Sequence, residues 1–552
     1  MKSRTPRPSR VSRGLAAATL IVAGLLLQTS GTTALAAAGD ARMPLGPDDL
    51  VTQASDVRTL ATGVTYQTYT QGYASDSWTV WAQRDGTETF GSRSAAESFV
   101  AELADEGFSG VVDTFTAPAS SDTAGGVFGY GVRVGTFGPD RLAAADRLEG
   151  WLRTAGFGAR VIYTAQDGAA STGPWKVHVV RVAPTAAVTF KAVHGQDVST
   201  AQTVRDMATA SGALAAVNGS EFDIHTFAGF SGYEGVPQGL YVQNDVLLGA
   251  ANNGRTALLL EGAGARARIA EVTSTVQVTA PNGDVRILDG VNRVPGRILG
   301  CGGVGGDQVA MSGTMTPTLK PWRNQLCQDD NEIVIFRPEW GSSTPAPFTG
   351  VTDSVDVVMN GNWVVQEIRS PAGGTIPAGG RVMQGIGEGA DWLKAHATVG
   401  STFKPGASIK DAEGKSVTSP TLSAVAGGGP ALVRGGEVFL NTAANGMTNF
   451  SGGPNSTLVQ RHPRSMAGVT ASGELLLVTV DGRDPGTSVG VTWPEAAGVM
   501  KWLGATDAVG LGSGGDATMV VDGTLANSPM DDWGTVPVER KMSTAVVIVP
   551  KA

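Results

Sequence analysis

The same pattern of strand, helix and strand occurs twice between Trp78 and Gln166, which constrains the fold of this part of the chain. Alternating or apolar runs predict four strands, at Trp78–Arg84, Val111–Ala117, Tyr130–Phe137 and Arg160–Ala165. An amphipathic helix lies within each half; a capping box at Ser94–Glu97 would begin the first helix, and Asp140 would cap the second. A polar, glycine-rich loop, Pro118–Gly126, joins the halves. The pattern predicts a small sheet with both helices on one face.

Such an arrangement is ferredoxin-like, and its residues resemble the SPOR family. The resemblance rests on the two-fold repeat and on Gly131–Phe137, which opens the second half. SPOR domains bind peptidoglycan. The resemblance therefore implies that residues 73–168 are a SPOR-like domain that tethers the protein to the cell wall. The alternative is a small packing domain that binds no ligand.

Residues 1–38 have the order of a secretory signal peptide. The basic residues Lys2, Arg4, Arg7, Arg10 and Arg13 come first. An apolar run, Leu15–Leu27, and a small-residue stretch, Ala34–Ala38, follow. The alternative is a membrane anchor, but the apolar run is shorter than the roughly 20 residues that a spanning helix needs. No later apolar stretch approaches that length, so we expect a secreted, extracellular protein with no membrane span after signal cleavage.

Length and composition limit the fold and the partner. At 552 residues the chain exceeds one ordinary domain, because cores stop growing near about 250–300 residues. Only 16% of the residues are charged and 76 are glycine, which favours strands and turns over long solvated helices. The net charge of −9 argues against a nucleic-acid partner, which would need a basic surface. A sugar polymer or a small solute is the easier partner.

Few residues are suited to metal or redox chemistry. The two cysteines, Cys301 and Cys327, predict one disulfide in an oxidising compartment. The five histidines are dispersed and no HExxH motif is present, so we expect no metal site. Gly510–Gly515 matches GxGxxG only in form, because an apolar strand follows where a nucleotide site needs a helix. We therefore expect no cofactor.

From Trp175 to the end, the sequence predicts long antiparallel strands, glycine-rich turns and few helices. We expect a larger, mixed and mainly antiparallel β-rich catalytic domain at residues 169–552, which makes the protein α+β. Residues 272–350 have irregular spacing and hold both cysteines, which indicates an elaboration. Residues 39–72 are a linker or the first strand of this larger domain, in which case the SPOR-like unit is an insertion.

Six short motifs follow one another in the larger domain. They are Asn218-Gly219, Gly427–Pro430, Arg461–Gly468, Asp481–Arg483, Asn527–Pro529 and Glu539-Arg540. In this order they resemble the phosphodiester glycosidase family, whose known member removes N-acetylglucosamine from a phosphate diester on mannose. The resemblance covers Trp175 to the C-terminus and implies a hydrolase of sugar-1-phosphodiester linkages.

That reaction accounts for the residue types in the motifs. A sugar bonded to phosphate through its anomeric carbon has a good leaving group, so the site needs guanidinium groups for the phosphate and a carboxylate for the reacting carbon or for water. The expected catalytic residues are Asp481, Arg464, Arg483, Glu221, Asp223 and Asp516. The expected substrate-binding residues are Asn218, Gly219, Gly428, Gly429, His462, Thr518 and Asn527. The alternative for each is a surface salt bridge or a turn.

One departure from the family pattern affects the expected activity. The family has Leu-Asp-Gly-Gly-Gly-Ser-Thr-Thr where this chain has Leu511 to Thr518. Gly512 thus replaces the aspartate, and Asp516 replaces the serine. Either Asp516 supplies the carboxylate from a shifted position, or the site is weakened or takes a different substrate.

A hairpin is expected to bring Arg464 and Asp481 together. If Ala471–Glu474 is a tight turn, pairing of its two ends places Arg464 directly opposite Asp481 on one face of the sheet. Arg483 would lie on the same face if the strand continues. A register shift of one residue would turn one side chain to the other face.

Two functions remain for the whole chain. The first is an exported cell-envelope hydrolase that cleaves sugar-1-phosphodiester linkages and is held on peptidoglycan by the SPOR-like domain. The second is a catalytically inactive wall- or glycan-binding protein on the same fold. Gly512 favours the second, whereas the intact Arg464, Asp481 and Arg483 favour the first.

Overall fold

The computed structural model describes residues 42–223, 233–252, 254–299, 301–311, 314–323, 326–347, 350–417, 422–447 and 459–551. The chain divides after Ala38, and everything described below belongs to the compact unit Gly39–Ala552. The expected signal peptide, residues 1–38, lies outside the described residues. Within the described part, no helix combines the length and the apolar character needed to cross a membrane.

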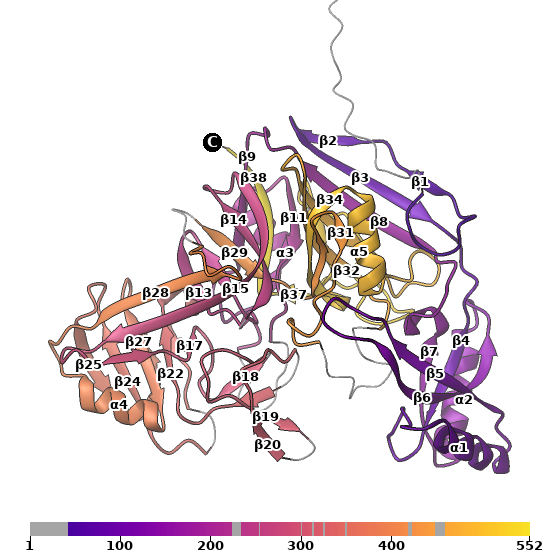
Figure 1. Ribbon diagram of the computed structural model, residues 1–552, viewed down its shortest axis with the longest axis horizontal. Coiled ribbons are helices and arrows are strands. Elements are labelled where there is room, and N and C mark those ends of the chain that lie inside the picture. Colours follow the sequence, from indigo (N-terminus) through magenta and orange to yellow (C-terminus); the bar gives the residue numbers. More distant parts are fainter. Residues whose placement is uncertain are drawn as a thin grey trace, which may run out of the picture. The chain divides into compact units, whose positions relative to one another are not determined.

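The fold is rich in mainly antiparallel sheet and has few helices, as the glycine-rich and charge-poor sequence predicts (Figure 1). The largest sheet has nine strands in the order β1-β3-β8-β33-β32-β34-β30-β31, with β2 paired to β3. Its strands are β1 (Thr52–Ala54), β2 (Arg58–Ala61), β3 (Val64–Gln71), β8 (Trp175–Val182), β30 (Ala431–Arg434), β31 (Glu437–Val438), β32 (Arg464–Thr470), β33 (Leu475–Val480) and β34 (Ala505–Ser513). Residues 52–71 therefore belong to the same sheet as the C-terminal half of the chain.

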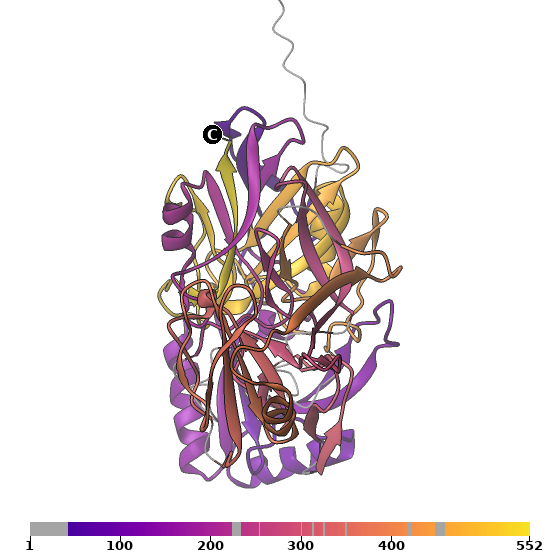
Figure 2. The ribbon, with the colours of Figure 1, turned by 90° about the vertical axis from the view of Figure 1, so that its left-hand side faces the viewer.

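A five-stranded sheet packs against this one, in the order β36-β35-β11-β38-β9. Its strands are β9 (Val188–His194), β11 (Ala215–Asn218), β35 (Met519–Val521), β36 (Thr524–Leu525) and β38 (Thr544–Pro550). The yellow strand β38 lies between β11 and β9 (Figure 2). Val217 of β11, Leu477 of β33 and Leu258 of a third sheet belong to one fully buried core. Helix α3 (Val204–Ser211) packs on the other face of the five-stranded sheet.

The third sheet has seven strands, in the order β13-β12-β29-β14-β15-β16 with β28 paired to β15. Its strands are β12 (Tyr241–Gln243), β13 (Val246–Gly249), β14 (Arg255–Glu261), β15 (Arg266–Thr279), β16 (Val285–Ile287), β28 (Lys404–Asp411) and β29 (Ser423–Ala426). Beyond it lie a sheet β17-β22-β27-β24-β25 with helix α4 (Glu388–His396) and a sheet β18-β21-β19-β20. Their strands are β17 (Gly290–Val291), β18 (Arg297–Leu299), β19 (Gln308–Met311), β20 (Thr314–Pro317), β21 (Leu326–Gln328), β22 (Ile333–Phe336), β24 (Ser354–Met359), β25 (Val365–Arg369) and β27 (Arg381–Ile386).

A small sheet is formed by the chain between β3 and β8, which are hydrogen-bonded neighbours. Its elements are β4 (Trp78–Gln83), α1 (Arg93–Asp105), β5 (Gly110–Ala117), β6 (Gly126–Phe137), α2 (Leu142–Thr154) and β7 (Gly158–Tyr163). The strand order is β5-β6-β4-β7, and all neighbours are antiparallel. Helix α1 packs on β5 and β6, and α2 packs on β4, β6 and β7.

Both helices of this small unit begin differently from the prediction. Ser92, not Ser94, caps α1, since its side chain accepts a hydrogen bond from the backbone N of Ala95 at 3.3 Å. Ser92 has the extended backbone of a cap residue (φ −139°, ψ 151°), whereas Ser94 already lies inside the helix. At α2 the cap position is Arg141 and no side chain caps the helix, so the prediction for Asp140 is wrong.

The predicted disulfide is confirmed. Cys301 and Cys327 are bonded, with their Cα atoms 5.8 Å apart and both side chains buried. The bond closes a loop with a sequence separation of 26 residues.

Loss of this bond is expected to lower the free energy of unfolding by about 3 kcal/mol, because the open loop gains conformational entropy in the unfolded chain. Denaturant unfolding of the oxidised protein, the reduced protein and the Cys301→Ala/Cys327→Ala variant measures the effect. The reduced protein is the control for the side-chain atoms that the variant lacks. An unchanged unfolding midpoint after reduction would show that the bond does not contribute.

Candidate functional site

Asn218, the last residue of β11, joins the nine-stranded and five-stranded sheets at the candidate site. Its Nδ2 donates to the carbonyl oxygen of Gly512 near the end of β34 at 3.0 Å. Its Oδ1 accepts from the backbone N of Thr518, also at 3.0 Å, and the whole residue is buried. The nitrogen and the oxygen of the Asn218 amide are therefore both hydrogen-bonded to backbone groups. Asn218 positions the segments that carry Glu221 and Asp516, which differs from the expected contact with a sugar.

Two buried carboxylates, those of Glu221 and Asp516, interact electrostatically at this junction. Glu221 accepts a hydrogen bond from Nη2 of Arg323, and Asp516 accepts one from Nη1 of Arg540 at 2.9 Å. Burial and then the charge of Glu221 raise the pKa of Asp516 to about 7, against the opposing charge of Arg540. A carboxyl group with this pKa exchanges its proton near neutral pH, as a general acid or base must.

Gly512, the residue that departs from the family pattern, lies directly beside Asp516. A Cβ atom on Gly512 would lie 2.8 Å from Nδ2 of Asn218 and 3.2 Å from the carbonyl oxygen of Gly219. It would also lie 3.3 Å from Oδ2 of Asp516, which belongs to the short 3-10 helix η4 (Gly514–Asp516). The carboxylate of Asp516 is therefore next to the place where a side chain at position 512 would begin.

Five arginines interact electrostatically with these carboxylates. They are Arg255, Arg323, Arg464, Arg483 and Arg540. Burial and then the charge of Arg323 lower the pKa of Arg255 to about 10, and they lower the pKa of Arg464 as well. Mutual repulsion between buried guanidinium groups is relieved when an anion binds among them. The cluster is therefore suited to a phosphate group.

Arg464 is fully buried at the start of β32. Its Nε donates to the carbonyl oxygen of Val491 at 2.8 Å, and its Nη2 donates to that of Gln460 at 3.0 Å. The guanidinium carbon lies 3.7 Å from the ring centre of Trp493, the first residue of helix α5 (Trp493–Trp502). Backbone and ring together hold the charge in one position.

The hairpin of β32 and β33 has a register that differs by one residue from the predicted one. Arg464 pairs with Val480, not with Asp481. The turn has a three-residue loop within residues 470–474, and Gly473 supplies a positive φ of 83°. This loop replaces the expected two-residue turn. The predicted opposition of Arg464 and Asp481 is therefore wrong, because a shift of one residue turns the side chains to different faces.

Asp481 instead belongs to a buried polar network on the face away from Arg464. Its Oδ2 lies 3.0 Å from Nε2 of His178, and its Oδ1 accepts from the backbone N of Ser528 at 2.9 Å. Nδ1 of His178 is 2.8 Å from the hydroxyl oxygen of Tyr66. The carboxylate thus connects β8 to the segment around Ser528 and does not meet Arg464.

Arg483 fixes the tautomer of His462. Its Nη2 donates to Nδ1 of the imidazole at 3.1 Å. A guanidinium group has only donors, so the proton of the neutral ring lies on Nε2. His462 is 6% exposed, and its Nε2 has no hydrogen-bond partner among the described residues. Burial and then the charges of Arg483 and Arg464 lower the pKa of His462 well below its usual value, so the ring is a neutral donor.

The motif glycines allow close packing of the backbone around the site. A Cβ atom on Gly429 would lie 2.2 Å from the ring of Trp493. One on Gly428 would lie 2.6 Å from the carbonyl oxygen of Leu511, and one on Gly219 would lie 2.2 Å from a threonine hydroxyl. Each position is too crowded for a side chain, so these glycines let the backbone pack closely around the site.

Asn527 and Thr518 lie beside η4. Asn527 accepts from the backbone N of Met519 at 2.7 Å and donates to the carbonyl oxygen of Ala517 at 2.9 Å, so its amide also holds backbone. The hydroxyl of Thr518 is buried and has no hydrogen-bond partner among the described residues. Of this pair, only Thr518 offers a polar group to a ligand.

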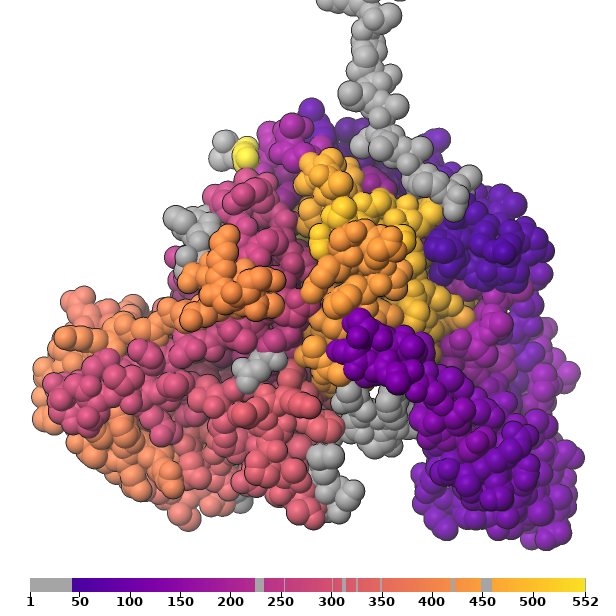
Figure 3. Space-filling view, in the orientation of Figure 1, coloured from indigo at the N-terminus to yellow at the C-terminus, as the bar shows by residue number. Residues whose placement is uncertain are grey.

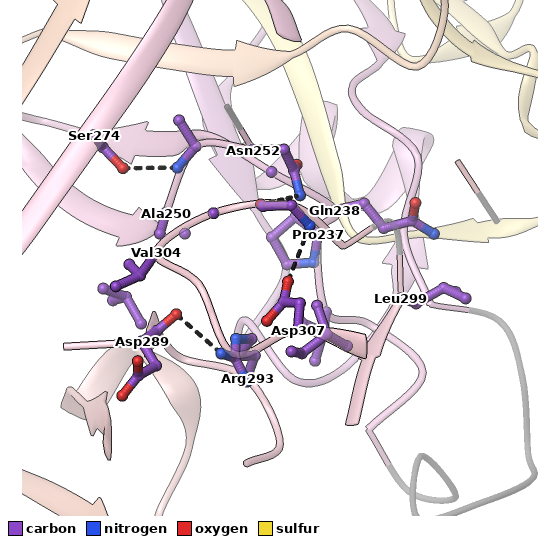
Figure 4. A pocket seen from close by; sticks show the side chains of 18 of the residues that line it. Pro237, Gln238, Ala250, Asn252, Ser274, Asp289, Arg293, Leu299, Val304 and Asp307 are labelled. Atoms are coloured by element: carbon purple, nitrogen blue, oxygen red, sulfur yellow. Dashed lines mark hydrogen bonds between the residues drawn. The ribbon is translucent and has the colours of Figure 1, made fainter. Parts of the chain in front are cut away.

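Asp223 lines a cavity of about 80 Å³. Gln238, Asn252, Arg293 and Asp307 also line it (Figure 4). A volume of this size holds a few water molecules. The structure thus brings Glu221 and Asp516 together but leaves Asp223 and Asp481 in other surroundings.

A cluster of three acidic side chains near this cavity has oxygen atoms close enough together to bind one metal ion. Carboxylate oxygens of Asp307, Asp329 and Glu332 lie within 4.8 Å of one another. Burial and then the charge of Glu332 raise the pKa of Asp329 to about 6. Arg293 already donates to Glu332 from Nη1 at 2.8 Å, so part of this negative charge is neutralised within the protein.

Three of the clustered arginines were not predicted from the sequence. Arg540 belongs to the last of the six motifs, but the motif alone does not show that it meets Asp516. Arg323 lies in the irregular region near Cys327 and far in sequence from Glu221, so no local pattern marks it. Arg255 begins β14 without any motif.

Residues 353–549 match the sequence profile of the phosphodiester glycosidase family. The matched range contains Arg464, Arg483 and Asp516, whereas Glu221 and Arg323 precede it in the sequence. No curated protein matches the chain.

Solved structures are similar over most of the chain. A protein of Burkholderia pseudomallei described as exported shares 29% identity over 93% of this chain and 99% of its own, with a TM-score of 0.77. A hypothetical protein of Synechocystis shares the fold, with 16% identity over 90% of this chain and 76% of its own and a TM-score of 0.50. The catalytic domain of zebrafish N-acetylglucosamine-1-phosphodiester alpha-N-acetylglucosaminidase is more distant, with 12% identity, coverage of 87% and 88%, and a TM-score of 0.32.

Proposed function

We propose that the protein is an exported hydrolase that cleaves sugar-1-phosphodiester linkages in cell-envelope glycans. The observation that carries the proposal is the buried pair of Glu221 and Asp516 among five arginines. Such a site offers acid–base chemistry and anion binding in one place. The family match over residues 353–549 and the likeness to an exported Burkholderia pseudomallei protein support the same function.

In this proposal the arginines and His462 bind the phosphate. Nε2 of His462 donates a hydrogen bond to a phosphate oxygen, which gives this buried donor the partner that it lacks among the described residues. Arg464 and Arg483 add positive charge, and their hydrogen bonds to the protein keep them in place before substrate arrives.

Glu221 and Asp516 act on the bond between the anomeric carbon and the phosphate oxygen. Asp516 donates its proton to that oxygen as the bond breaks, and the phosphate leaves as a phosphomonoester. Glu221, which is paired with Arg323, stabilises the positive charge on the sugar and takes the proton of the attacking water. The oxygen of that water then bonds to the anomeric carbon, and the free sugar leaves.

A hollow lined by Arg540 offers room for the group on the other side of the phosphate. Its volume is about 500 Å³, and Phe222, Arg540 and Lys541 are among the residues that line it. Arg540 also donates to Asp516, so a group bound in the hollow lies one side chain away from the proposed acid. Its lining combines the cations of Arg540 and Lys541 with the aromatic ring of Phe222 and the carboxylate of Glu234.

Turnover of a chromogenic sugar-1-phosphodiester by the purified protein tests the proposal. We expect release of the chromogenic phosphomonoester together with free sugar. The alternative function, an inactive glycan-binding protein, predicts binding without release. The position of Asp516 beside Gly512 supports an active site in which the carboxylate has moved by four positions in the sequence.

We also propose that the small unit between β3 and β8 holds the protein on peptidoglycan. Its strand order β5-β6-β4-β7, with one helix in each half, supports the ferredoxin-like arrangement that the SPOR resemblance implies. The SPOR-like phrase Gly131–Phe137 forms the second half of β6. These two features support the proposed association of the small unit with peptidoglycan in the cell wall.

Excision of the small unit is expected to abolish co-sedimentation with purified peptidoglycan. Gln71 of β3 pairs directly with Trp175 of β8, so an Asn-Gly turn can replace residues 72–174 and join the two strands as a hairpin. Pelleting of the full chain and of the excised variant is compared at equal concentration, with thermal unfolding as the control for folding. Equal pelleting of the two proteins would place the wall contact elsewhere.

A further inference from the structure

We propose that Asp122 of the small unit is a positioning residue for the active site. It holds residues 440–447, here called the 440–447 turn, and this turn fixes Arg323 against Glu221. The catalytic consequence rests on the function proposed above, whereas the support of Arg323 does not. The small unit is then a structural part of the catalytic machinery as well as a wall-binding module.

The loop between β5 and β6 is bonded directly to the 440–447 turn. Asp122 accepts hydrogen bonds from the backbone N of Ala443 at 3.1 Å and of Ala444 at 2.9 Å, one on each carboxylate oxygen. Its neighbour Ser121 donates from its backbone N to the carbonyl oxygen of Leu440 at 2.8 Å. In the space-filling view, the dark purple tip of this hairpin lies against the orange surface of the C-terminal half (Figure 3).

The carboxylate of Asp122 accepts hydrogen bonds from backbone amides of the 440–447 turn, as a helix-capping side chain does. Within the turn, the backbone N of Gly446 donates to the carbonyl oxygen of Ala443 at 3.0 Å, and that of Asn445 donates to the carbonyl oxygen of Asn441 at 3.3 Å. As at the start of a helix, the first amides of such a turn have no acceptor inside it. Asp122 supplies the acceptor from a distant part of the chain, with the added strength of a charged group.

The other end of the turn holds Arg323. The backbone N of Arg323 donates to the carbonyl oxygen of Gly446 at 3.1 Å. Gly446 has a positive φ of 76°, and a Cβ atom there would lie 2.8 Å from the same nitrogen. The two segments are therefore in tight contact, and the guanidinium of this arginine pairs with Glu221.

The same turn supports a second clustered arginine. Oδ1 of Asn445 accepts from the backbone N of Thr256 at 3.0 Å. The preceding residue is Arg255, whose Nη2 donates to the carbonyl oxygen of Gly427 at 2.6 Å. A shift of the 440–447 turn thus displaces two of the five arginines at once.

Displacement of Arg323 also has a predictable effect on pH dependence. The charged groups that act on Asp516 are Glu221, Arg323, Arg483 and Arg540. Arg540 and, to a smaller extent, Arg323 lower the pKa of Asp516, so movement of Arg323 away from the site raises that pKa. Loss of Asp122 should therefore move the alkaline limb of the kcat profile to higher pH, an effect that a general loss of stability does not produce.

The experiment compares Asp122→Asn with Asp146→Asn in the full chain. Both substitutions remove one exposed carboxylate from the small unit, but Asp146 lies on α2 and makes no hydrogen bond to the larger domain among the described residues. We expect Asp122→Asn to lower kcat on a small chromogenic substrate by about 2- to 30-fold. Its alkaline limb should shift upward and its pelleting with peptidoglycan should not change, and Asp146→Asn should match the wild type in all three.

If Asp122→Asn has the same kcat as the wild type, and its kcat falls at the same alkaline pH, the inference is overturned. Hydrogen exchange at the backbone amides of Trp322 and Arg323 provides a readout that does not need turnover. If the wild type turns over no substrate, the proposed function fails. Faster exchange at these residues in Asp122→Asn would then still support the role of Asp122, and unchanged exchange would reject it.

Discussion

Asp516→Asn is expected to lower kcat on a sugar-1-phosphodiester by about 10²- to 10⁴-fold, the range for loss of a general acid. Asparagine keeps the shape of the side chain and an acceptor for Arg540 but has no proton to give. Steady-state kinetics measure the effect. A wild-type kcat in Asp516→Asn would remove this residue from the mechanism and leave Gly512 without a compensating carboxylate.

The pH dependence of the wild type should follow from the same residue. Since burial and Glu221 raise the pKa of Asp516 to about 7, the protonated acid is lost as the pH rises through that value. The kcat of the wild type should therefore fall above about pH 7. An activity that stays constant to pH 9 would mean that Asp516 is not the acid.

The pH dependence of stability gives an independent check on the direction of the pKa shift of Asp516. The pKa of Asp516 is raised from 3.8 when unfolded to about 7 when folded, so the folded state binds more protons between these values. The contribution of this group to stability is therefore greatest below pH 3.8 and is lost as the pH rises to about 7. Asp516→Asn lacks this dependence. Its thermal stability relative to the wild type should rise from pH 4 to pH 8, although its activity is lower.

Glu221→Gln is expected to lower kcat by about 10²- to 10³-fold, because the positive charge that develops on the sugar loses the opposite charge beside it. The amide also cannot take a proton from water. Glu221→Ala offers a sharper test, since added formate can enter the vacated space. We expect formate to restore part of the turnover of Glu221→Ala and none of that of Asp516→Ala. Equal activity of Glu221→Gln and the wild type would point to a different carboxylate.

The sequence predicted features that depend on composition, order and local pattern. Glycine-rich turns and scarce charges indicated antiparallel sheets, and the only two cysteines indicated the disulfide that the structure contains. The sequence predicted the individual helix-capping residues less reliably. A capping box at Ser94 and a cap at Asp140 were plausible patterns, but the α1 helix begins at Arg93 after Ser92 and α2 has no side-chain cap.

The candidate site shows where sequence patterns stop being informative. The spacing of Arg464 and Asp481 would place them opposite each other across a two-residue turn, but Gly473 favours a longer loop and shifts the register by one. Arg323 meets Glu221 only through the folding of two segments 102 residues apart. The amides of Asn218 and Asn527 are hydrogen-bonded to backbone groups around the site, a role that the motif itself does not reveal.

The central proposal is that water attacks the sugar carbon, not the phosphorus. Hydrolysis of a sugar-1-phosphodiester in ¹⁸O-labelled water, followed by mass spectrometry of both products, tests this most directly. The proposed roles of Glu221 and Asp516 predict one ¹⁸O atom in the released sugar and none in the phosphomonoester. Label in the phosphomonoester would mean that the P–O bond breaks, and the protein would then be a phosphodiesterase and not a glycosidase.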